Sequence, residues 1–142
     1  MTDRLTLYLV RGLPGSGKTS LAEKLAPGHV YSADDFFYRL GEGKYAFDAD
    51  RLSEAHQDCQ ETVEEALRQK VPSVAVANTF SKAWEAAPYY KLADQHGYSV
   101  FVIECQSQFG NVHDVPAESI RRMIARWEPL RRPDEERRDS QG

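Results

Sequence analysis

Gly12-Leu13-Pro14-Gly15-Ser16-Gly17-Lys18-Thr19 follows the apolar run LTLYLV at residues 5–10 and decides the fold of this chain. The run is short and rich in strand formers, and apolar residues at helical spacing follow in residues 18–25. The octapeptide satisfies the pattern G-x-x-x-x-G-K-[ST] at every position. A strand, a glycine loop and a helix in this order predict a phosphate-binding loop.

The chemistry of such a loop assigns a role to each polar residue. Its glycines let backbone N–H groups approach a phosphate beside the positive end of the following helix. We expect Lys18 to bridge the β- and γ-phosphates of ATP, Thr19 to bind Mg²⁺ and Ser20 to reach the α-phosphate. The predicted nucleotide-binding residues are Gly12, Pro14, Gly15, Ser16, Gly17, Lys18, Thr19 and Ser20. The loop alone does not distinguish a kinase from an NTPase, a motor or a switch.

The rest of the chain alternates strand and helix patterns. Further strands are predicted at residues 29–32, 73–77 and 98–103, and a helical turn starts at Asp34. Helices are predicted at residues 51–69, with Asp50 as N-cap, at 82–96, where Pro88 introduces a kink or a break, and at 118–127. This order predicts an α/β P-loop fold, in which a small parallel sheet of about four strands carries helices on both faces. One domain is expected over residues 1–128, with a flexible charged tail at 129–142.

Composition narrows the classes of function. The chain has 142 residues and a net charge of −4. This charge argues against a protein that coats duplex DNA generally, because such proteins are normally basic. No stretch approaches the roughly 20 apolar residues of a membrane span, so no membrane partner is expected. Cys59 and Cys105 are far apart and in no metal-binding pattern, which indicates buried, reduced thiols and a cytoplasmic location. Seven of the 12 arginines lie between Arg121 and Arg138.

Two predicted strands end in polar residues. Ligands of parallel sheets bind outside the carboxyl ends of the strands, which is where Asp34, Asp35 and Asn78 are expected. One carboxylate of the pair could accept the proton of a phosphoryl acceptor, although Asp34 could instead cap the following helix. Asn78 could hold a Mg²⁺-bound water or the acceptor, or its side chain could bond to its own backbone in a turn.

Several motifs of the sequence, taken together, are similar to those of a known family. The phosphate loop, Ser32–Phe37, Tyr45–Asp48, Asn78-Thr79 and the helix after Val115-Pro116 together resemble the P-loop kinases of phage polynucleotide 5′-hydroxyl kinase type. The similarity runs from about residue 5 to residue 128. It implies that Asp34 is the general base and that Lys18 and Thr19 bind nucleotide and Mg²⁺. It also implies that the protein is located in the cytoplasm of a bacterial or phage-infected cell.

Three positions depart from the family pattern. The arginine that contacts an acceptor-strand phosphate is replaced by Phe37, the acidic residue before Asn78 by Ala77, and the lid arginine by Gly110. Arg121, Arg122 or Arg126 could supply the missing charge. We therefore expect Arg126 among the catalytic residues with Asp34 and Lys18. The expected acceptor-binding residues are Asp35, Phe37, Asn78, Arg121 and Arg122.

The leading hypothesis is an ATP-dependent kinase whose acceptor is a hydroxyl on a nucleic acid, with DNA preferred over RNA. The hydroxyl could be a 5′ end, or the hydroxymethyl group of a modified pyrimidine such as 5-hydroxymethyluracil in phage DNA. Five aromatic residues between positions 36 and 47 favour a base-sized acceptor, because such rings can stack on an unpaired base. The alternatives are a small-molecule or nucleoside kinase and a non-catalytic, nucleotide-dependent interaction module.

Overall fold

The computed structural model describes residues 4–13 and 17–105. The elements in these ranges alternate along the chain much as the sequence predicts. The strands are β1 (Thr6–Gly12), β2 (Val30–Tyr31), β3 (Ser73–Asn78) and β4 (Ser99–Cys105). The helices are α1 (Lys18–Leu25), α2 (Asp34–Leu40), α3 (Leu52–Arg68) and α4 (Ala83–His96), and a 3-10 turn η1 (Ala49–Arg51) precedes α3.

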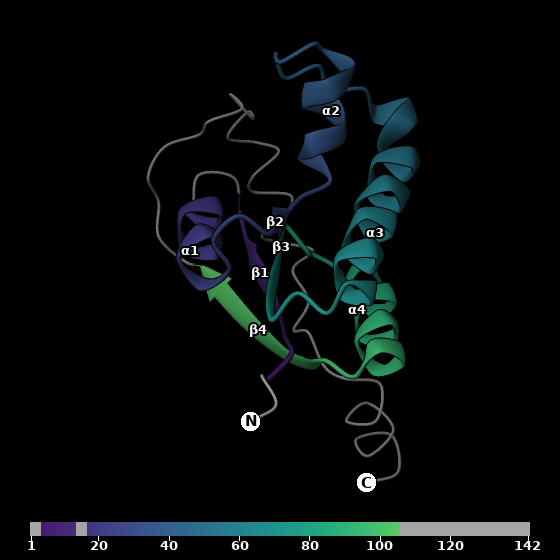
Figure 1. Cartoon of the computed structure of the whole chain (residues 1–142). Coiled ribbons are helices and arrows are strands. Elements are labelled where there is room, and N and C mark those ends of the chain that lie inside the picture. The colour runs from purple at the N-terminus through teal and green to yellow at the C-terminus, as the bar shows by residue number, and fades with distance from the viewer. Residues whose placement is uncertain (1–3, 14–16, 106–142) are drawn as a thin grey trace, which may run out of the picture.

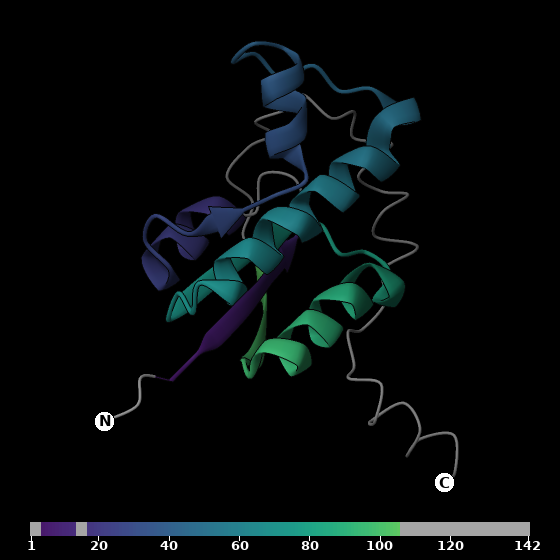
Figure 2. The same ribbon diagram turned by 45° about the vertical axis from the view of Figure 1, so that its right-hand side comes forward.

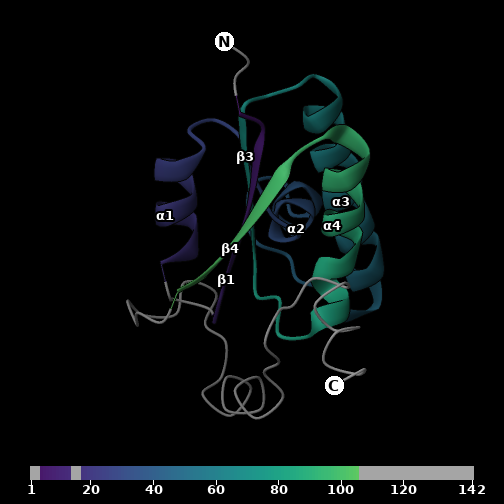
Figure 3. The ribbon, with the colours of Figure 1, turned by 90° about the horizontal axis from the view of Figure 1, so that it is seen from below.

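The four strands form one parallel sheet in the order β2-β3-β1-β4. Strand β1 is central, with Thr6 paired to Ser73 on one side and to Ser99 on the other. Helix α1 covers one face of the sheet, while α3 and α4 cover the other (Figure 1, Figure 3). The predicted α/β P-loop architecture, with about four parallel strands and helices on both faces, is confirmed.

Residue size differs between the two faces of the sheet. Leu7 and Leu9 of β1 belong to the larger core, which is completed by residues of β3, α3 and α4. Val10 faces α1 together with Ala75 and Ala77. Because side chains alternate along a strand, the alanines lie on one face and let α1 pack closely against the sheet.

A third, smaller core joins α2 to α3. Ala33 and Phe37 pack with Ala55, and Phe36 and Tyr45 lie against them. In Figure 2, α2 projects beyond the sheet near the start of α3. This small core fixes the position of the segment that follows β2, which carries the two adjacent aspartates.

Two local predictions about the helices are corrected. Asp50 does not cap the long helix, because the Asp48 side chain accepts a hydrogen bond from Asp50 N (3.0 Å) and starts the turn η1. Pro88 does not divide α4, which runs unbroken from Ala83 to His96, so the break is excluded and the kink stays a prediction. A proline removes only one backbone hydrogen bond from a helix, and Ala86, Tyr89 and Ala93 pack into the core on either side of it.

Other predictions concern burial or fall outside the described ranges. Both cysteines are free, but only Cys59 is buried, whereas Cys105 is half-buried. Across residues 4–13 and 17–105, we find no helix with the length and apolar character needed to cross a membrane. The predicted helix at 118–127 and the tail at 129–142 lie outside the described residues, as do Arg121, Arg122 and Arg126.

Candidate active site at the carboxyl edge of the sheet

The strand register brings the polar segments to one edge. Arg11 pairs with Asn78 across β1 and β3, and Gly12 pairs with Cys105 across β1 and β4. Because all four strands are parallel, the phosphate loop, the β2–α2 turn and Asn78 share this edge. The expected grouping of these segments therefore follows from the topology.

The described part of the phosphate loop has the backbone that the motif requires. Gly17 has φ = +86°, a left-handed conformation that favours glycine, and α1 begins at the next residue. Lys18 folds back so that Nζ donates a hydrogen bond to the Leu13 carbonyl at 3.2 Å. Thr19 and Ser20 are exposed in the first turn of α1, while Pro14, Gly15 and Ser16 lie outside the described residues.

The ammonium group of Lys18 is partly buried. Burial lowers the pKa of its ammonium group, and the nearby Asp34 and Cys105 oppose that shift. Lys18 thus interacts electrostatically with a carboxylate from the neighbouring turn. One edge of the sheet therefore holds both a cation that can bind phosphate, Lys18, and a carboxylate that can accept a proton, Asp34.

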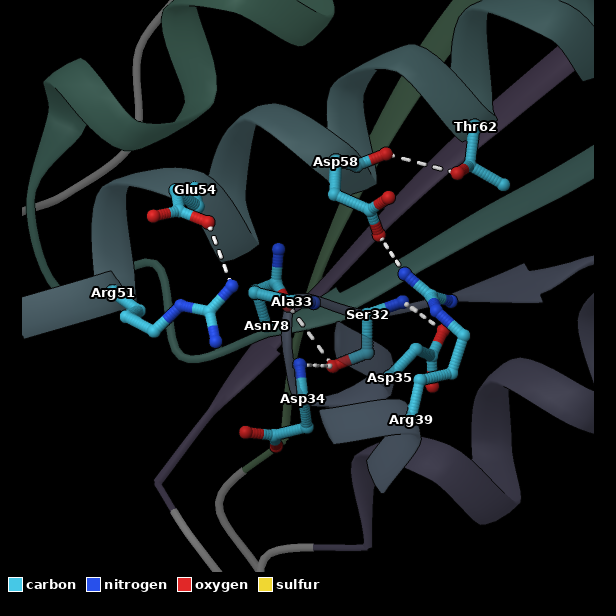
Figure 4. Close-up of polar contacts among 10 residues, drawn as sticks. All are labelled: Ser32, Ala33, Asp34, Asp35, Arg39, Arg51, Glu54, Asp58, Thr62 and Asn78. Atoms are coloured by element: carbon cyan, nitrogen blue, oxygen red, sulfur yellow. Dashed lines mark hydrogen bonds and ion pairs between the residues drawn. The ribbon is translucent and has the colours of Figure 1, made fainter. Parts of the chain in front are cut away.

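The two adjacent aspartates have different roles in the β2–α2 turn (Figure 4). Asp35 Oδ2 accepts a hydrogen bond from Ser32 N (3.0 Å), and Ser32 Oγ accepts one from Asp34 N (3.1 Å). These reciprocal bonds resemble a capping box at the start of α2. The carboxylate of Asp35 therefore stabilises the start of α2, and its contact with the acceptor stays a prediction.

The Asp34 side chain takes a different direction. Figure 4 shows its carboxylate pointing away from the group formed by Asp35, Arg39 and Asp58. Its Oδ1 accepts a hydrogen bond from the Tyr45 hydroxyl at 2.9 Å. Burial raises the pKa of Tyr45, and the charge of Asp34 and their hydrogen bond raise it further, so the phenol remains a donor.

Asn78 connects β3 to the turn that carries Asp34. Its Oδ1 accepts hydrogen bonds from Ala33 N (2.9 Å) and Ser32 Oγ (3.2 Å), and the residue is buried. Its side chain also interacts with Cys59 and Tyr89, and burial raises the pKa of the Cys59 thiol to about 11. The alternative of a turn in which the side chain bonds to its own backbone is corrected, because Oδ1 bonds to Ser32 and Ala33. Asn78 thus positions the β2–α2 turn, and its contact with the acceptor or a Mg²⁺-bound water stays a prediction.

Phe37 also differs from expectation. Its side chain is only 1% exposed and packs between Ala33 and Ala55 in the small α2–α3 core. A ring at this depth cannot contact an acceptor, so Phe37 is not an acceptor-binding residue. The aromatic side chain instead fixes α2 against α3.

Sequence reasoning missed two features of this edge. One is the contact of Tyr45 with Asp34, since the sequence places Tyr45 in a family motif and in an aromatic cluster but pairs it with no polar residue. The other is Arg11, which is 2% exposed, pairs with Glu104 at 3.4 Å and donates a hydrogen bond to the Phe80 carbonyl. An isolated arginine in an apolar strand, directly before a glycine loop, is the signal that could have revealed it.

The contact between Tyr45 and Asp34 leads to a first prediction. A hydrogen bond to a charged group contributes about 1.5–3 kcal/mol, so Tyr45→Phe should lower kcat for phosphoryl transfer by about 10- to 150-fold. The same bond is lost from the folded protein, so the melting temperature should fall by several degrees while the fold is kept. Tyr38→Phe is the matched control, because Tyr38 packs on Tyr45 with ring centroids 5.2 Å apart. Full activity of Tyr45→Phe would exclude a role for this hydrogen bond in turnover.

Comparison with known proteins agrees with this geometry. The sheet, the helices and the phosphate loop together define a P-loop, kinase-like nucleotide-binding fold. The chain belongs to the family described as AAA domain, which matches residues 7–108.

Two curated relatives are much longer than this chain, and one protein of similar fold has a low sequence identity to it. The chain is 37% identical over 137 residues to NEDD4-binding protein 2 of Homo sapiens, covering 87% of this chain and 8% of that protein. It is 32% identical over 104 residues to 2′,3′-cyclic-nucleotide 3′-phosphodiesterase of Mus musculus, covering 70% of this chain and 23% of that protein. A protein from Chloroflexus aurantiacus, provisionally described as a kinase, has a similar fold. Its TM-score is 0.60 at 22% identity, over 74% of this chain and 61% of that one. The chain thus spans less than a quarter of the two curated relatives.

Proposed function

We propose that this chain is an ATP-dependent kinase that transfers the γ-phosphate of ATP to a hydroxyl on a nucleic acid. The observation that carries the proposal is the division of roles in the aspartate pair. Asp35 accepts a hydrogen bond from Ser32 N at the start of α2, whereas Asp34 interacts with Lys18 and accepts a hydrogen bond from Tyr45. A carboxylate held beside the phosphate-binding lysine suits the orientation and deprotonation of an acceptor hydroxyl.

The proposed transfer assigns one role to each residue. Asp34 accepts the proton of the acceptor hydroxyl as its oxygen bonds to the γ-phosphorus. The bond from that phosphorus to the β–γ bridging oxygen breaks, and ADP leaves. Lys18 stabilises the charge that develops on the phosphate oxygens. The exposed Thr19 hydroxyl would hold Mg²⁺, which neutralises phosphate charge when it is bound.

A nucleic-acid acceptor is supported by sequence and by one relative. The mouse relative is named for its action on 2′,3′-cyclic nucleotides, which are phosphate esters of a ribose. The sequence also concentrates arginines at residues 121–138, which suits a polyanion. The acceptor hydroxyl is proposed to be a 5′ end or the hydroxymethyl group of a modified pyrimidine.

A panel of acceptors tests this proposal. ATP labelled at the γ-phosphate is incubated with single-stranded DNA and RNA that carry 5′-hydroxyls. Parallel reactions contain 5′-phosphorylated duplex DNA with internal 5-hydroxymethyluracil, or free nucleosides. We expect label on one of the polymers, with kcat/KM well above that of the nucleosides. Equal or better labelling of nucleosides would favour a nucleoside kinase and exclude the proposed acceptor.

A second prediction concerns the arginines of the C-terminal region. Phosphate contacts release counterions, so KM for a polymeric acceptor should rise steeply with salt. Replacing Arg121 and Arg122 together by alanine should raise that KM and reduce the slope of log KM against log salt by about 1–2. The double variant Arg137→Ala, Arg138→Ala removes the same charge and is the matched control. Identical slopes for both double variants would exclude Arg121 and Arg122 as acceptor contacts.

A further inference from the structure

An exposed phenylalanine, Phe47, lies next to the tyrosine that contacts Asp34, the proposed general base. Five aromatic rings gather between α2 and the segment of residues 44–48, and their exposure differs widely: they are Phe36, Phe37, Tyr38, Tyr45 and Phe47. Phe37 is 1% exposed, whereas Phe47 is 56% exposed. Phe36 is half-buried, and the Arg51 guanidinium lies over its ring at 5.0 Å. Phe47 is therefore the most accessible ring of the group.

The position of the Phe47 ring is fixed from within the protein. Its centroid lies 5.1 Å from that of Phe37 and 6.4 Å from that of Tyr45, and the Tyr45 and Phe47 rings are nearly parallel, at 19°. Ala46 N donates a hydrogen bond to the Phe37 carbonyl (3.2 Å), and Asp48 caps the turn η1. A ring held in place in this way loses little conformational freedom when a ligand stacks on it.

Tyr45 connects this ring to the proposed chemistry. Its hydroxyl contacts Asp34, and its ring neighbours that of Phe47. A nucleoside with a 5′-hydroxyl has a matching layout, because its sugar separates the hydroxyl, which would meet Asp34, from the flat nucleobase, which would meet Phe47. We infer that Phe47 stacks on the base of the nucleoside that carries the acceptor hydroxyl. This inference rests on the proposed function and adds to it a subsite that tolerates any base, since every base has a π face.

Acceptors with and without a terminal base test the subsite. The two probes are 5′-hydroxyl DNA oligonucleotides that are identical except that the 5′-terminal residue of one is abasic. Stacking on a protein ring is worth about 5- to 150-fold in affinity per base. We expect Phe47→Leu to raise KM for the ordinary oligonucleotide by a factor in this range, with kcat within twofold. KM for the abasic oligonucleotide should be high for the wild-type protein and unchanged by the substitution.

The chain provides a matched control. Phe101 in β4 is also 56% exposed and packs on Tyr8 with ring centroids 6.2 Å apart, so Phe101→Leu removes an equally exposed ring elsewhere. It should leave both KM values unchanged. Fluorescence anisotropy of the two labelled oligonucleotides, measured without ATP, gives the same comparison independently of turnover.

Different results would overturn the subsite and the proposed function. Equal KM values for the two oligonucleotides with the wild-type protein would refute the subsite and leave the kinase intact. So would an equal effect of Phe47→Leu on both. A wild-type protein that phosphorylates nucleosides but binds and labels neither oligonucleotide would refute the nucleic-acid kinase, and the subsite with it.

Discussion

Replacement of Lys18 by alanine is expected to abolish phosphoryl transfer. Lys18 follows the left-handed Gly17, and its ammonium group lies at the partly enclosed edge beside Asp34. Negative charge develops on the transferred phosphate, and removing one fixed donor to such charge typically lowers kcat about 10²- to 10³-fold. The measurement is single-turnover transfer of the labelled γ-phosphate at saturating ATP.

Two controls make this result specific. Lys24→Ala removes an exposed lysine from the last turn of the same helix and should leave transfer unchanged. The melting temperature of Lys18→Ala should stay close to the wild-type value, because the hydrogen bond of Lys18 to the Leu13 carbonyl is long at 3.2 Å. A loss of less than tenfold would show that the loop does not hold the phosphates as described.

Replacement of Asp34 by asparagine should have a comparable effect on kcat. Asparagine keeps the size of the side chain and can still accept the hydrogen bond from Tyr45. It cannot accept the proton of an acceptor hydroxyl, so kcat should fall roughly 10²-fold or more. KM for ATP should change little, because the general base is expected to act on the acceptor.

Asp35→Asn is the paired comparison for this experiment. Asparagine can still accept the hydrogen bond from Ser32 N, so this variant should keep most of the activity. Asp35→Ala removes the hydrogen bond from Ser32 N and should cost about 0.5–1.5 kcal/mol of stability, measured by urea unfolding. A severe loss with Asp35→Asn and a mild one with Asp34→Asn would reverse the proposed assignment within the pair.

The fold could be predicted from the sequence because its signals are local and periodic. The run at residues 5–10 and the octapeptide Gly12–Thr19 together specify one strand–loop–helix unit, and the later segments repeat the alternation of strand and helix. Parallel strands bring their carboxyl ends to one edge, so the grouping of Lys18, Asp34 and Asn78 at that edge followed from the predicted topology. The sheet order and register confirm that arrangement.

The details of the site depended on contacts that residue types do not encode. Asp34 and Asp35 are chemically identical, and their different roles arise from which carboxylate can reach Ser32 N across the turn. Phe37 and Phe47 are both phenylalanines, but one packs against Ala55 in α3 and the other lies in the exposed segment after Tyr45. Such differences depend on tertiary packing, which a local pattern does not contain.

The role of Asn78 illustrates the same limit. An Asn-Thr pair after a strand is compatible with a metal contact, an acceptor contact or a turn. The observed bonds instead reach Ser32 and Ala33, 46 and 45 residues earlier in the chain. Only the pairing of β2 with β3 brings these residues together, and that pairing is a property of the folded sheet.

The fate of the γ-phosphate tests the central claim most directly. The protein is incubated with γ-labelled ATP, Mg²⁺ and a single-stranded 5′-hydroxyl DNA oligonucleotide, or with 5′-phosphorylated duplex containing 5-hydroxymethyluracil. The label is then separated into ester-bound and free phosphate. We predict ester-bound label on one of these DNAs with the wild-type protein, and a decrease of roughly 10²-fold or more in its rate of formation with Asp34→Asn. Release of label only as free phosphate, or equal ester formation by Asp34→Asn, would contradict a kinase that uses Asp34 as its base.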